Sequence, residues 1–302
     1  MGTPNFAKNI FEGIINANYN VGLIVSQPDK VVGRKKILTP TAVKELALEK
    51  GIDVFQPYKI RTDFEKIKEY QPDLIITCAY GQILPKELLD LPPLGCINIH
   101  ASLLPKLRGG APIHHSIIKG HDKTGITIMN MVEKMDAGDI YYQREISITD
   151  NDTYDSLHDR LSNLGKELIL EFLPKYLNRN YKSIPQNEEE VTFGYNIKRE
   201  EERINWDLDT RSVFNLIRGL NSIPGAYTTL NGKTVKVFDV RLGEKKVISE
   251  SGTILNLDDK IEVQCKDGTI YIDSLQFEGK KRTSSIDFLR GNKKLLENGR
   301  FE

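Results

Sequence analysis

Short apolar runs alternate with a helix-like repeat through the first part of the chain. The apolar runs lie at 21–26, 73–79 and 95–100, and each has the length of a buried strand bounded by turn residues. Residues 41–50, between the first two runs, have helical spacing. Because strands that alternate with helices build parallel sheets covered by helices, this pattern predicts an α/β domain with a mostly parallel sheet.

A long amphipathic helix is predicted at 153–178, because large apolar residues recur there three or four positions apart. Asp152 or Thr153 can cap its start with a side-chain oxygen. The recurring residues are Leu157, Leu161, Leu164, Leu168 and Phe172.

The composition of the chain changes after this helix. Residues 180–203 are polar and charged and include two runs of three glutamates, which is typical of a solvated linker. A helix is then predicted at 210–221, before Pro224.

Short alternating strands dominate the last part of the chain. The turn pairs Asn231-Gly232 and Asp267-Gly268 are strong hairpin signals, and a small all-β barrel is a natural closure for such strands. The strands are predicted at 234–238, 260–265 and 269–272.

Composition narrows the classes of protein. A chain of 302 residues suits two domains, and a formal net charge of zero means that any nucleic acid must be held by local basic clusters. The three cysteines are far apart and show neither metal-ligand spacing nor a disulfide framework. No signal peptide and no apolar span of membrane length is present. We therefore expect a cytoplasmic protein without a metal or a membrane partner.

Polar residues suited to acyl transfer follow two strand-like runs. Asn98 and His100 end the run 95–100, and Asp136 lies in the loop after the run 124–132. Side chains two apart on a strand share a face, and ligands of open α/β sheets bind outside the carboxyl ends of strands. An amide for a developing oxyanion, an imidazole for the proton and a carboxylate to orient it suit acyl-type transfer. A set of structural polar residues is the alternative.

The motifs around these residues closely resemble the 10-formyltetrahydrofolate-dependent formyltransferases, and among them the members that act on methionyl-tRNA. The resemblance covers essentially the whole chain. No single motif is decisive, but their order is very specific. The matching segments are 2–7, 27–29, 33–36, 98–100, 102–105, 108–112, 136–138, 224–227, 230–233, 275–282 and 287–291.

The resemblance implies both the architecture and the reaction. It implies a Rossmann-like catalytic domain over 1–179, a linker over 180–198 and an OB-like tRNA-binding domain over 199–302. A formyl group would pass from the co-substrate 10-formyltetrahydrofolate to the α-amine of initiator methionyl-tRNA. Asn98 would donate to the formyl oxygen, and Asp136 would orient His100. The sequence leaves open whether His100 is a base or an oxyanion donor. We expect a monomer.

The resemblance also implies two walls of a folate pocket. One is the loop after the strand at 95–100, where backbone groups would meet the pterin, although a tight turn is the alternative. The other is the segment 79–85, where Tyr80 is expected to pack rather than to touch the folate. The implied folate residues are Ser102, Leu103, Leu104, Pro105, Ile83 and Leu84.

Two basic clusters are the implied tRNA contacts. The first lies in a loop that would enter the acceptor stem near its unpaired end and meet phosphates and base edges. A solvated basic loop is the alternative. The second cluster would contact the tRNA backbone. The clusters are Arg34, Lys35 and Lys36, and Lys280, Lys281 and Arg282.

The chain departs from the family at its start. The family has an apolar strand immediately before the Gly-Thr-Pro motif, whereas Met1 directly precedes Gly2 here. Losing such a central strand would cost about 1–3 kcal/mol for each buried backbone group left unpaired. We expect that the start is assigned at an internal Met or that the chain is truncated, and the sequence does not decide between the two.

Two other functions fit parts of the pattern. A formyltransferase for a small amine, such as an amino sugar or a glycinamide nucleotide, would use Asn98, His100 and Asp136 but would not need the basic loop or the barrel. A tRNA-binding protein without catalysis would not need the three polar residues. Transfer of labelled formyl to methionyl-tRNA or to small amines separates these functions.

Overall fold

The computed structural model describes residues 1–33, 36–258 and 260–302. The chain forms two compact units, and each of them is discontinuous in sequence. The first comprises 1–112, 123–147 and 158–195, and the second comprises 113–122, 148–157 and 196–302.

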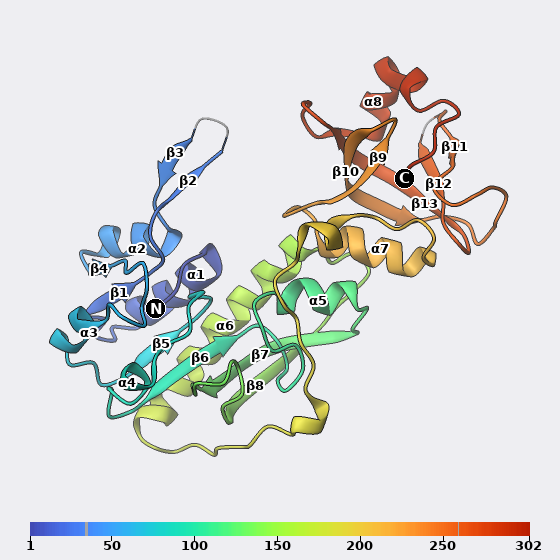
Figure 1. Ribbon diagram of the computed structural model, residues 1–302. Coiled ribbons are helices and arrows are strands. Elements are labelled where there is room, and N and C mark those ends of the chain that lie inside the picture. Colours follow the sequence, from blue (N-terminus) through green and yellow to red (C-terminus); the bar gives the residue numbers. More distant parts are fainter. Residues whose placement is uncertain (34–35, 259) are drawn as a thin grey trace. The chain divides into compact units, whose positions relative to one another are not determined.

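Eight α-helices are present in the part of the chain that the structure describes. They are α1 (Asn5–Asn16), α2 (Ala42–Lys50), α3 (Glu65–Glu69), α4 (Lys86–Leu89), α5 (Pro112–Ile118), α6 (Tyr154–Leu177), α7 (Thr210–Gly219) and α8 (Ser285–Asn292) (Figure 1). Short 3₁₀ turns lie at Glu188–Glu190, Arg199–Glu202 and Lys293–Leu295.

The strands fall into two series. The first unit holds β1 (Leu23–Val25), β2 (Lys30–Val32), β3 (Ile37–Thr39), β4 (Asp53–Phe55), β5 (Ile75–Thr77), β6 (Cys96–His100), β7 (Lys123–Asn130) and β8 (Ile140–Ser147). The second unit holds β9 (Ala226–Leu230), β10 (Lys233–Leu242), β11 (Ile254–Asn256), β12 (Ile261–Gln264), β13 (Thr269–Phe277) and β14 (Thr283–Ser284).

The first unit is an α/β domain, and the strands predicted at 21–26, 73–79 and 95–100 are confirmed as β1, β5 and β6. Strand β1 pairs in parallel with β4, and β5 pairs in parallel with β6. Residues Met1 and Gly2 link these two sheets. The Gly2 amide donates to the Val25 carbonyl, and the Cys78 amide donates to the Met1 carbonyl, both at 2.9 Å.

Strand β7 lies at the predicted position but runs antiparallel to β6, with Ile97 opposite Asn130 and His100 opposite Thr127. The expectation that the site loops meet at the carboxyl ends of neighbouring strands is therefore wrong for β7. Its carboxyl end lies beside the start of β6, so Asp136 reaches the site only because its loop extends back toward His100.

Helix α2 confirms the helix predicted at 41–50. The Thr41 hydroxyl accepts from the Lys44 amide at its start, and Gly51 ends it in the left-handed conformation at φ 67°. The predicted amphipathic helix is α6, whose five recurring apolar residues are all buried. The Thr153 hydroxyl accepts from the Ser156 amide at its start. No helix of the described residues is long and apolar enough to cross a membrane.

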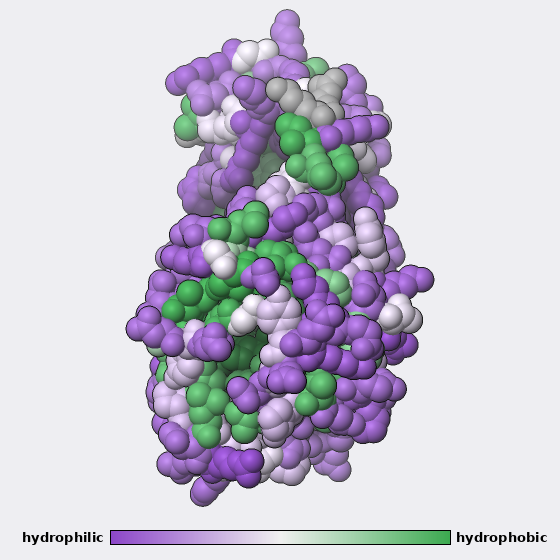
Figure 2. All heavy atoms as spheres, turned by 90° about the vertical axis from the view of Figure 1, so that its left-hand side faces the viewer, coloured by the Kyte–Doolittle hydropathy of each residue, from purple (hydrophilic) through white to green (hydrophobic). Residues whose placement is uncertain are grey.

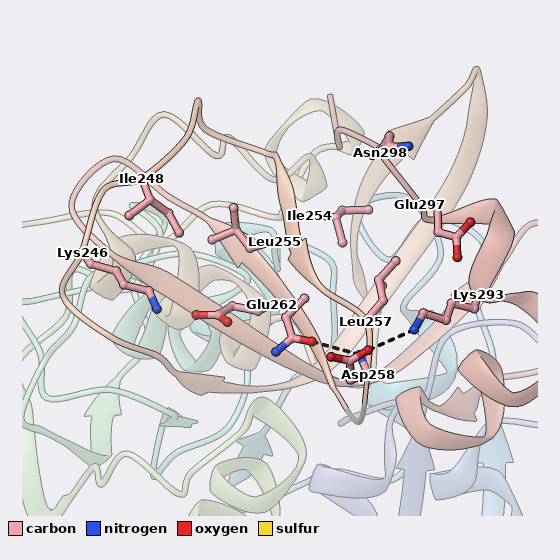
Figure 3. A pocket seen from close by; sticks show the side chains of 11 residues that line it. Lys246, Ile248, Ile254, Leu255, Leu257, Asp258, Glu262, Lys293, Glu297 and Asn298 are labelled. Atoms are coloured by element: carbon pink, nitrogen blue, oxygen red, sulfur yellow. Dashed lines mark hydrogen bonds and ion pairs between the residues drawn. The ribbon is translucent and has the colours of Figure 1, made fainter.

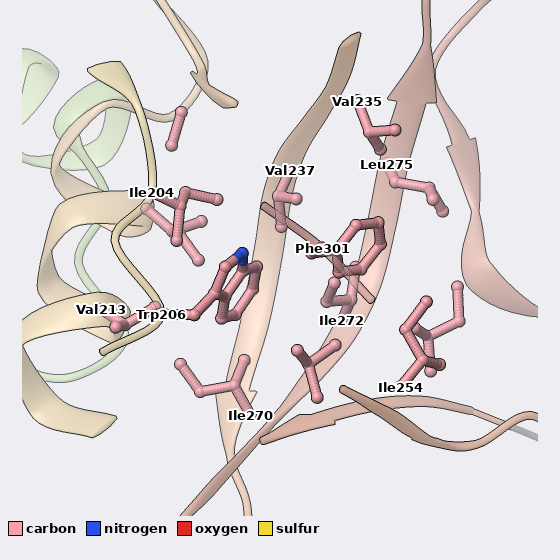
Figure 4. Close-up of a cluster of buried hydrophobic side chains, with 14 of the residues drawn as sticks. Ile204, Trp206, Val213, Val235, Val237, Ile254, Ile270, Ile272, Leu275 and Phe301 are labelled. Atoms are coloured by element: carbon pink, nitrogen blue, oxygen red, sulfur yellow. The ribbon is translucent and has the colours of Figure 1, made fainter. Parts of the chain in front are cut away.

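The second unit is built on a curled antiparallel sheet in the order β11-β12-β13-β10-β9, with β14 paired to β13. The sheet closes over a core in which the Trp206 and Phe301 rings stack with their centres 5.8 Å apart (Figure 4). The turn pair Asn231-Gly232 joins β9 to β10, and both residues have positive φ, at 50° and 72°. The hairpin predicted at Asp267-Gly268 is confirmed. Its connection is longer than the turn pair and comprises residues 265–268, because Gln264 and Thr269 pair across it.

Helix α7 is completed by segments from much earlier in the chain. The Arg218 guanidinium is buried, and its Nη1 donates to the carbonyls of Thr149 at 2.6 Å and Asp152 at 3.0 Å. A Cβ at Gly219 would lie 2.7 Å from the Ile118 side chain, so only glycine allows this approach. The segments 113–122 and 148–157 therefore belong to the second unit.

Candidate active site

Strand β6 carries two of the three residues predicted to be catalytic. Asn98 and His100 are two positions apart, so their side chains lie on one face of the strand. His100 is buried and Asn98 is half-buried. The structure brings Asp136 to the same place, with its Oδ1 3.8 Å from His100 Nδ1.

The other ring nitrogen of His100 fixes its tautomer. Nε2 lies 3.0 Å from the Leu107 carbonyl oxygen, which can only accept a hydrogen bond. Nε2 therefore carries a proton, and in the neutral ring the lone pair is on Nδ1. The nitrogen that can accept a proton is thus the one beside Asp136.

The orientation of the Asn98 amide is set by Thr77 on β5. The buried Thr77 hydroxyl donates to Asn98 Oδ1 at 2.8 Å. Because the amide oxygen is engaged in this way, the NH₂ group is turned away from β5. Thr77 carries no catalytic chemistry of its own, so no sequence signal distinguishes it from an ordinary strand residue.

Asp136 is held in a strained loop. Its backbone is left-handed at φ 51°, which is uncommon for a residue other than glycine. Its Oδ2 accepts from the Gly109 amide at 2.8 Å. Two residues later, a Cβ at Gly138 would lie only 2.1 Å from the Asn130 carbonyl oxygen, so the loop requires glycine there.

The segment predicted to be a solvated linker contacts these loops. Its side chains are mostly exposed, as their polarity predicts, but its backbone pairs with the first unit at two places. Ile184 exchanges two hydrogen bonds with Ile140, at 2.8 and 2.9 Å. Gly194 donates to the Arg108 carbonyl and accepts from the Ala111 amide, at 2.8 and 2.9 Å. The interpretation as a wholly solvated linker is therefore wrong for 184–194.

A buried arginine joins this segment to the site loops. Arg108 is fully buried, and its Nη2 lies 2.7 Å from Glu188 Oε1. Hydrogen bonds from Arg108, followed by those from Lys134, lower the pKa of the exposed Glu188 carboxyl to about 2. Arg108 also donates to Gln186 Oε1 from Nε at 3.0 Å and from Nη2 at 2.8 Å.

The turn after β6 carries four of the predicted folate residues. The Ser102 carbonyl accepts from the Thr127 hydroxyl at 2.6 Å, and the Leu104 amide donates to the same hydroxyl at 3.2 Å. The Leu104 carbonyl accepts from Gln143 at 2.9 Å. These backbone groups are therefore satisfied by side chains of β7 and β8, and the side chains of Leu103 and Pro105 in the turn are half-buried.

The opposite predicted wall divides into buried and exposed parts. Tyr80 and Leu84 are in the core, which agrees with the packing role expected for Tyr80. Ile83 is 51% exposed and is free to line a ligand pocket. Gln82 fixes this loop, because its Oε1 accepts from the Ile60 amide at 2.9 Å.

Of the first basic cluster, the structure describes Lys36, which directly precedes β3 in the hairpin of β2 and β3 that projects from the first unit (Figure 1). Lys36 is exposed, whereas Arg34 and Lys35 lie outside the described residues. The sequence pattern predicts the basic character of this segment but not its exposed apolar side chains. Figure 2 shows apolar side chains of the hairpin in green. Its exposed apolar residues are Val31, Val32, Ile37 and Leu38, each at least 55% accessible.

The second basic cluster lies after β13 and its members differ. Lys281 is exposed, and Lys280 donates to Asn292 at 3.1 Å. Arg282 pairs with Asp239 at 2.6 Å and covers the Phe238 ring at 4.3 Å, so its guanidinium is already engaged within the second unit.

An open pocket on the second unit is lined by β11 and the residues after α8 (Figure 3). Its lining mixes both signs of charge, and Lys293 pairs with Asp258 at 3.1 Å. The pocket contains none of the residues that the sequence predicts for binding or catalysis.

The fold and the site together define an α/β transferase with an Asn–His–Asp set. Comparison with known protein families supports this class. The model of the formyl transferase family matches residues 1–173, and that of the formyl transferase C-terminal domain matches 196–293. The chain belongs to the formyl transferase family, a family of enzymes.

The curated relatives are similar over nearly their whole length. A methionyl-tRNA formyltransferase of Bacillus cereus strain B4264 is 50% identical in an alignment 300 residues long that covers 97% of this chain and 95% of the relative. One of Bacillus cytotoxicus is 51% identical over the same shares of the two chains.

Solved structures show the same fold. HypX from Aquifex aeolicus in complex with tetrahydrofolic acid is 25% identical with a TM-score of 0.61, over 81% of this chain and 43% of HypX. This chain thus spans less than half of HypX. A sugar 3N-formyl transferase, WlaRD, is 19% identical with a TM-score of 0.67, over 93% of this chain and 97% of its own, and supports the fold alone.

Proposed function

We propose that this protein transfers the formyl group of 10-formyltetrahydrofolate to the α-amine of initiator methionyl-tRNA. The product is N-formylmethionyl-tRNA, used in translation initiation. The observation that carries the proposal is the grouping of Asn98, His100 and Asp136, with the Asn98 oxygen held by Thr77 and its NH₂ left to donate. The match to relatives with this activity over nearly their whole length supports the choice of substrate.

The donor set fits a formyl group. A formyl oxygen accepts hydrogen bonds, and the Asn98 side chain presents donors because its own oxygen is engaged. The folate supplies an activated formyl group when it is bound. The exposed Ile83 side chain and the turn at 102–105 are proposed to hold the folate, with Leu84 supporting the wall from the core.

The three residues then divide the chemistry. The amine attacks the formyl carbon, and Asn98 donates to the formyl oxygen as negative charge develops there. His100 accepts the amine proton on Nδ1, because Nε2 is committed to the Leu107 carbonyl. Asp136, 3.8 Å away, stabilises the resulting imidazolium. As the oxyanion collapses, the bond between the formyl carbon and the folate nitrogen breaks, and that nitrogen leaves with a proton returned by the imidazolium, which gives tetrahydrofolate. The proposed role of His100 is therefore that of a base.

The tRNA contacts and domain roles complete the proposal. We assign catalysis to 1–179 and tRNA binding to an OB-like domain at 199–302, with the chain acting as a monomer. Arg34, Lys35 and Lys36 contact the end of the acceptor stem, and the exposed apolar side chains of β2 and β3 lie against bases. Lys280 and Lys281 contact phosphates, and Arg282 joins them only by giving up Asp239.

The test is single-turnover transfer of labelled formyl to initiator methionyl-tRNA. Replacing Asn98 or His100 with alanine should lower the rate roughly 100–1000-fold, as expected for loss of a group that stabilises the transition state. The affinity for tRNA should stay near that of the wild type. A His121→Ala variant controls for the loss of an unrelated histidine. Retention of most activity by His100→Ala would show that the site is wrongly assigned, and preferential transfer to small amines would refute the proposed substrate.

A further inference from the structure

We infer that Gln186 and Glu188, in the segment between the two family-model matches, are positioning residues that hold Asp136 against His100, Gln186 directly and Glu188 through Arg108. The inference rests on the proposed role of Asp136. It assigns part of catalysis to residues outside the predicted catalytic domain.

Gln186 uses both ends of its side-chain amide. Its Nε2 donates to the carbonyls of Asp136 at 2.8 Å and Gly138 at 2.7 Å. Its Oε1 accepts two hydrogen bonds from Arg108. One side chain therefore joins the backbone of the Asp136 loop to the loop that follows β6.

Arg108 is the centre of this network. A fully buried guanidinium needs a carboxylate and hydrogen-bond acceptors to offset its desolvation. Glu188 supplies the carboxylate and Gln186 the amide oxygen, while Nη1 has no hydrogen-bond partner among the described residues. The position of Arg108 thus depends on two side chains contributed by the segment 184–194.

The network holds Asp136 from two sides. The Gly109 amide, next to Arg108, fixes the carboxylate, and Gln186 fixes the backbone carbonyl. The Asp136 backbone is left-handed, so it needs such contacts to persist. Its distance of 3.8 Å from His100 leaves little room for movement before the electrostatic contact weakens.

The direct test is Gln186→Met, which keeps the length of the side chain and removes its hydrogen bonds. A displacement of about 1 Å in a catalytic group can cost roughly 100-fold in rate, so kcat should fall by about that factor. The KM values for tRNA and folate should change by less than about twofold, because the contacts made by Gln186 involve no substrate. Gln186→Glu keeps the acceptor for Arg108 but loses both donors, and it should be equally impaired.

The glutamate run provides a matched pair. Glu188→Gln removes the charge opposite Arg108, whereas Glu189→Gln changes the neighbouring exposed carboxylate, which takes no part in the network. We expect kcat to fall at least about tenfold in the first variant only, and Glu188→Asp to recover part of it. Near-UV circular dichroism establishes that the variants compared are folded. If Gln186→Met does not fold, the Glu188 and Glu189 pair decides the question.

The outcomes separate this inference from the proposed function. A wild-type protein without transfer to methionyl-tRNA would overturn the proposed function. An active wild type whose folded Gln186→Met and Glu188→Gln variants keep kcat would overturn the inference alone. A rise in KM for tRNA with kcat unchanged would also overturn it, because these residues would then be substrate contacts.

Discussion

At the scale of single residues, the site depends on which hydrogen-bonding groups are already engaged. His100 has one nitrogen committed to a backbone carbonyl, and Asn98 has its oxygen committed to Thr77. In the proposed mechanism, these two hydrogen bonds leave Nδ1 of His100 to accept a proton and the NH₂ group of Asn98 to donate to an oxyanion. The Leu107 carbonyl and the Thr77 hydroxyl therefore set which atoms of His100 and Asn98 are available.

Replacing Thr77 with valine should impair catalysis without removing a catalytic group. Valine has the shape of threonine but cannot hold Asn98 Oδ1, so the amide is free to turn. We expect kcat to fall about tenfold, less than the roughly 100–1000-fold cost of losing an oxyanion donor. The measurement is single-turnover transfer at saturating substrates. Thr77→Ser keeps the hydroxyl and should remain near the wild type; equal loss in both variants would contradict the argument.

At the scale of elements, the sequence predicts local structure well. The caps and apolar spacing of α2 and α6 and the apolar runs of β1, β5 and β6 are encoded within each segment. Pairing over long distances is not encoded locally. The antiparallel direction of β7 and the hydrogen bonds of Gly194 depend on partners far away in the sequence. The polar pattern of 184–194 therefore predicts that its side chains are exposed, but not that its backbone is hydrogen-bonded to the loops around the site.

The hairpin of β2 and β3 should govern the salt dependence of tRNA binding. Replacing Arg34, Lys35 and Lys36 together with alanine should reduce the slope of log affinity against log salt by about 0.7–0.9 for each phosphate that the protein no longer neutralises. Discrimination between initiator and elongator methionyl-tRNA should weaken as well. The measurement is affinity for both tRNAs at several salt concentrations. Equal weakening for both would make the hairpin a phosphate clamp only. Arg282→Ala should change the slope little, because Asp239 already binds that guanidinium.

The 3₁₀ turn Glu188–Glu190 should contribute a pH dependence to stability. The pKa of Glu188 falls to about 2 in the folded protein from an ordinary value of 4.5. The stabilisation is therefore complete above about pH 4.5 and is lost as the pH falls through about 2. Its size is small, because the carboxyl is exposed to solvent. Urea unfolding at several acidic pH values should show a steeper loss for the wild type than for Glu188→Gln. Identical slopes would mean that the pair with Arg108 does not contribute.

At the scale of the whole molecule, the second unit is assembled from three separate stretches of chain. Two of the acceptors of Arg218 belong to Thr149 and Asp152, which lie far before the family match at 196–293. A fragment limited to 199–302 would lack both acceptors and would expose the guanidinium to water.

Arg218→Met should therefore have different effects in two contexts. In the full chain it removes satisfied hydrogen bonds and should lower the melting temperature. In the fragment 199–302 the segment 148–157 no longer covers the guanidinium, so the same replacement should change the melting temperature little. Thermal unfolding of the four proteins checks this. A destabilisation in both contexts would show that the carbonyls of Thr149 and Asp152 are not what stabilises the arginine.

During synthesis of the chain, the buried Arg108 is made well before the side chains that bind it. Gln186 follows Arg108 by 78 positions, and at about 5–20 residues per second that interval takes roughly 4–16 s. Throughout it, a nascent chain already carries Asn98, His100 and, after about the first third of the interval, Asp136, but not the side chains that hold Asp136 in place. Most of the first unit is therefore synthesised before the side chains that hold Asp136 are available.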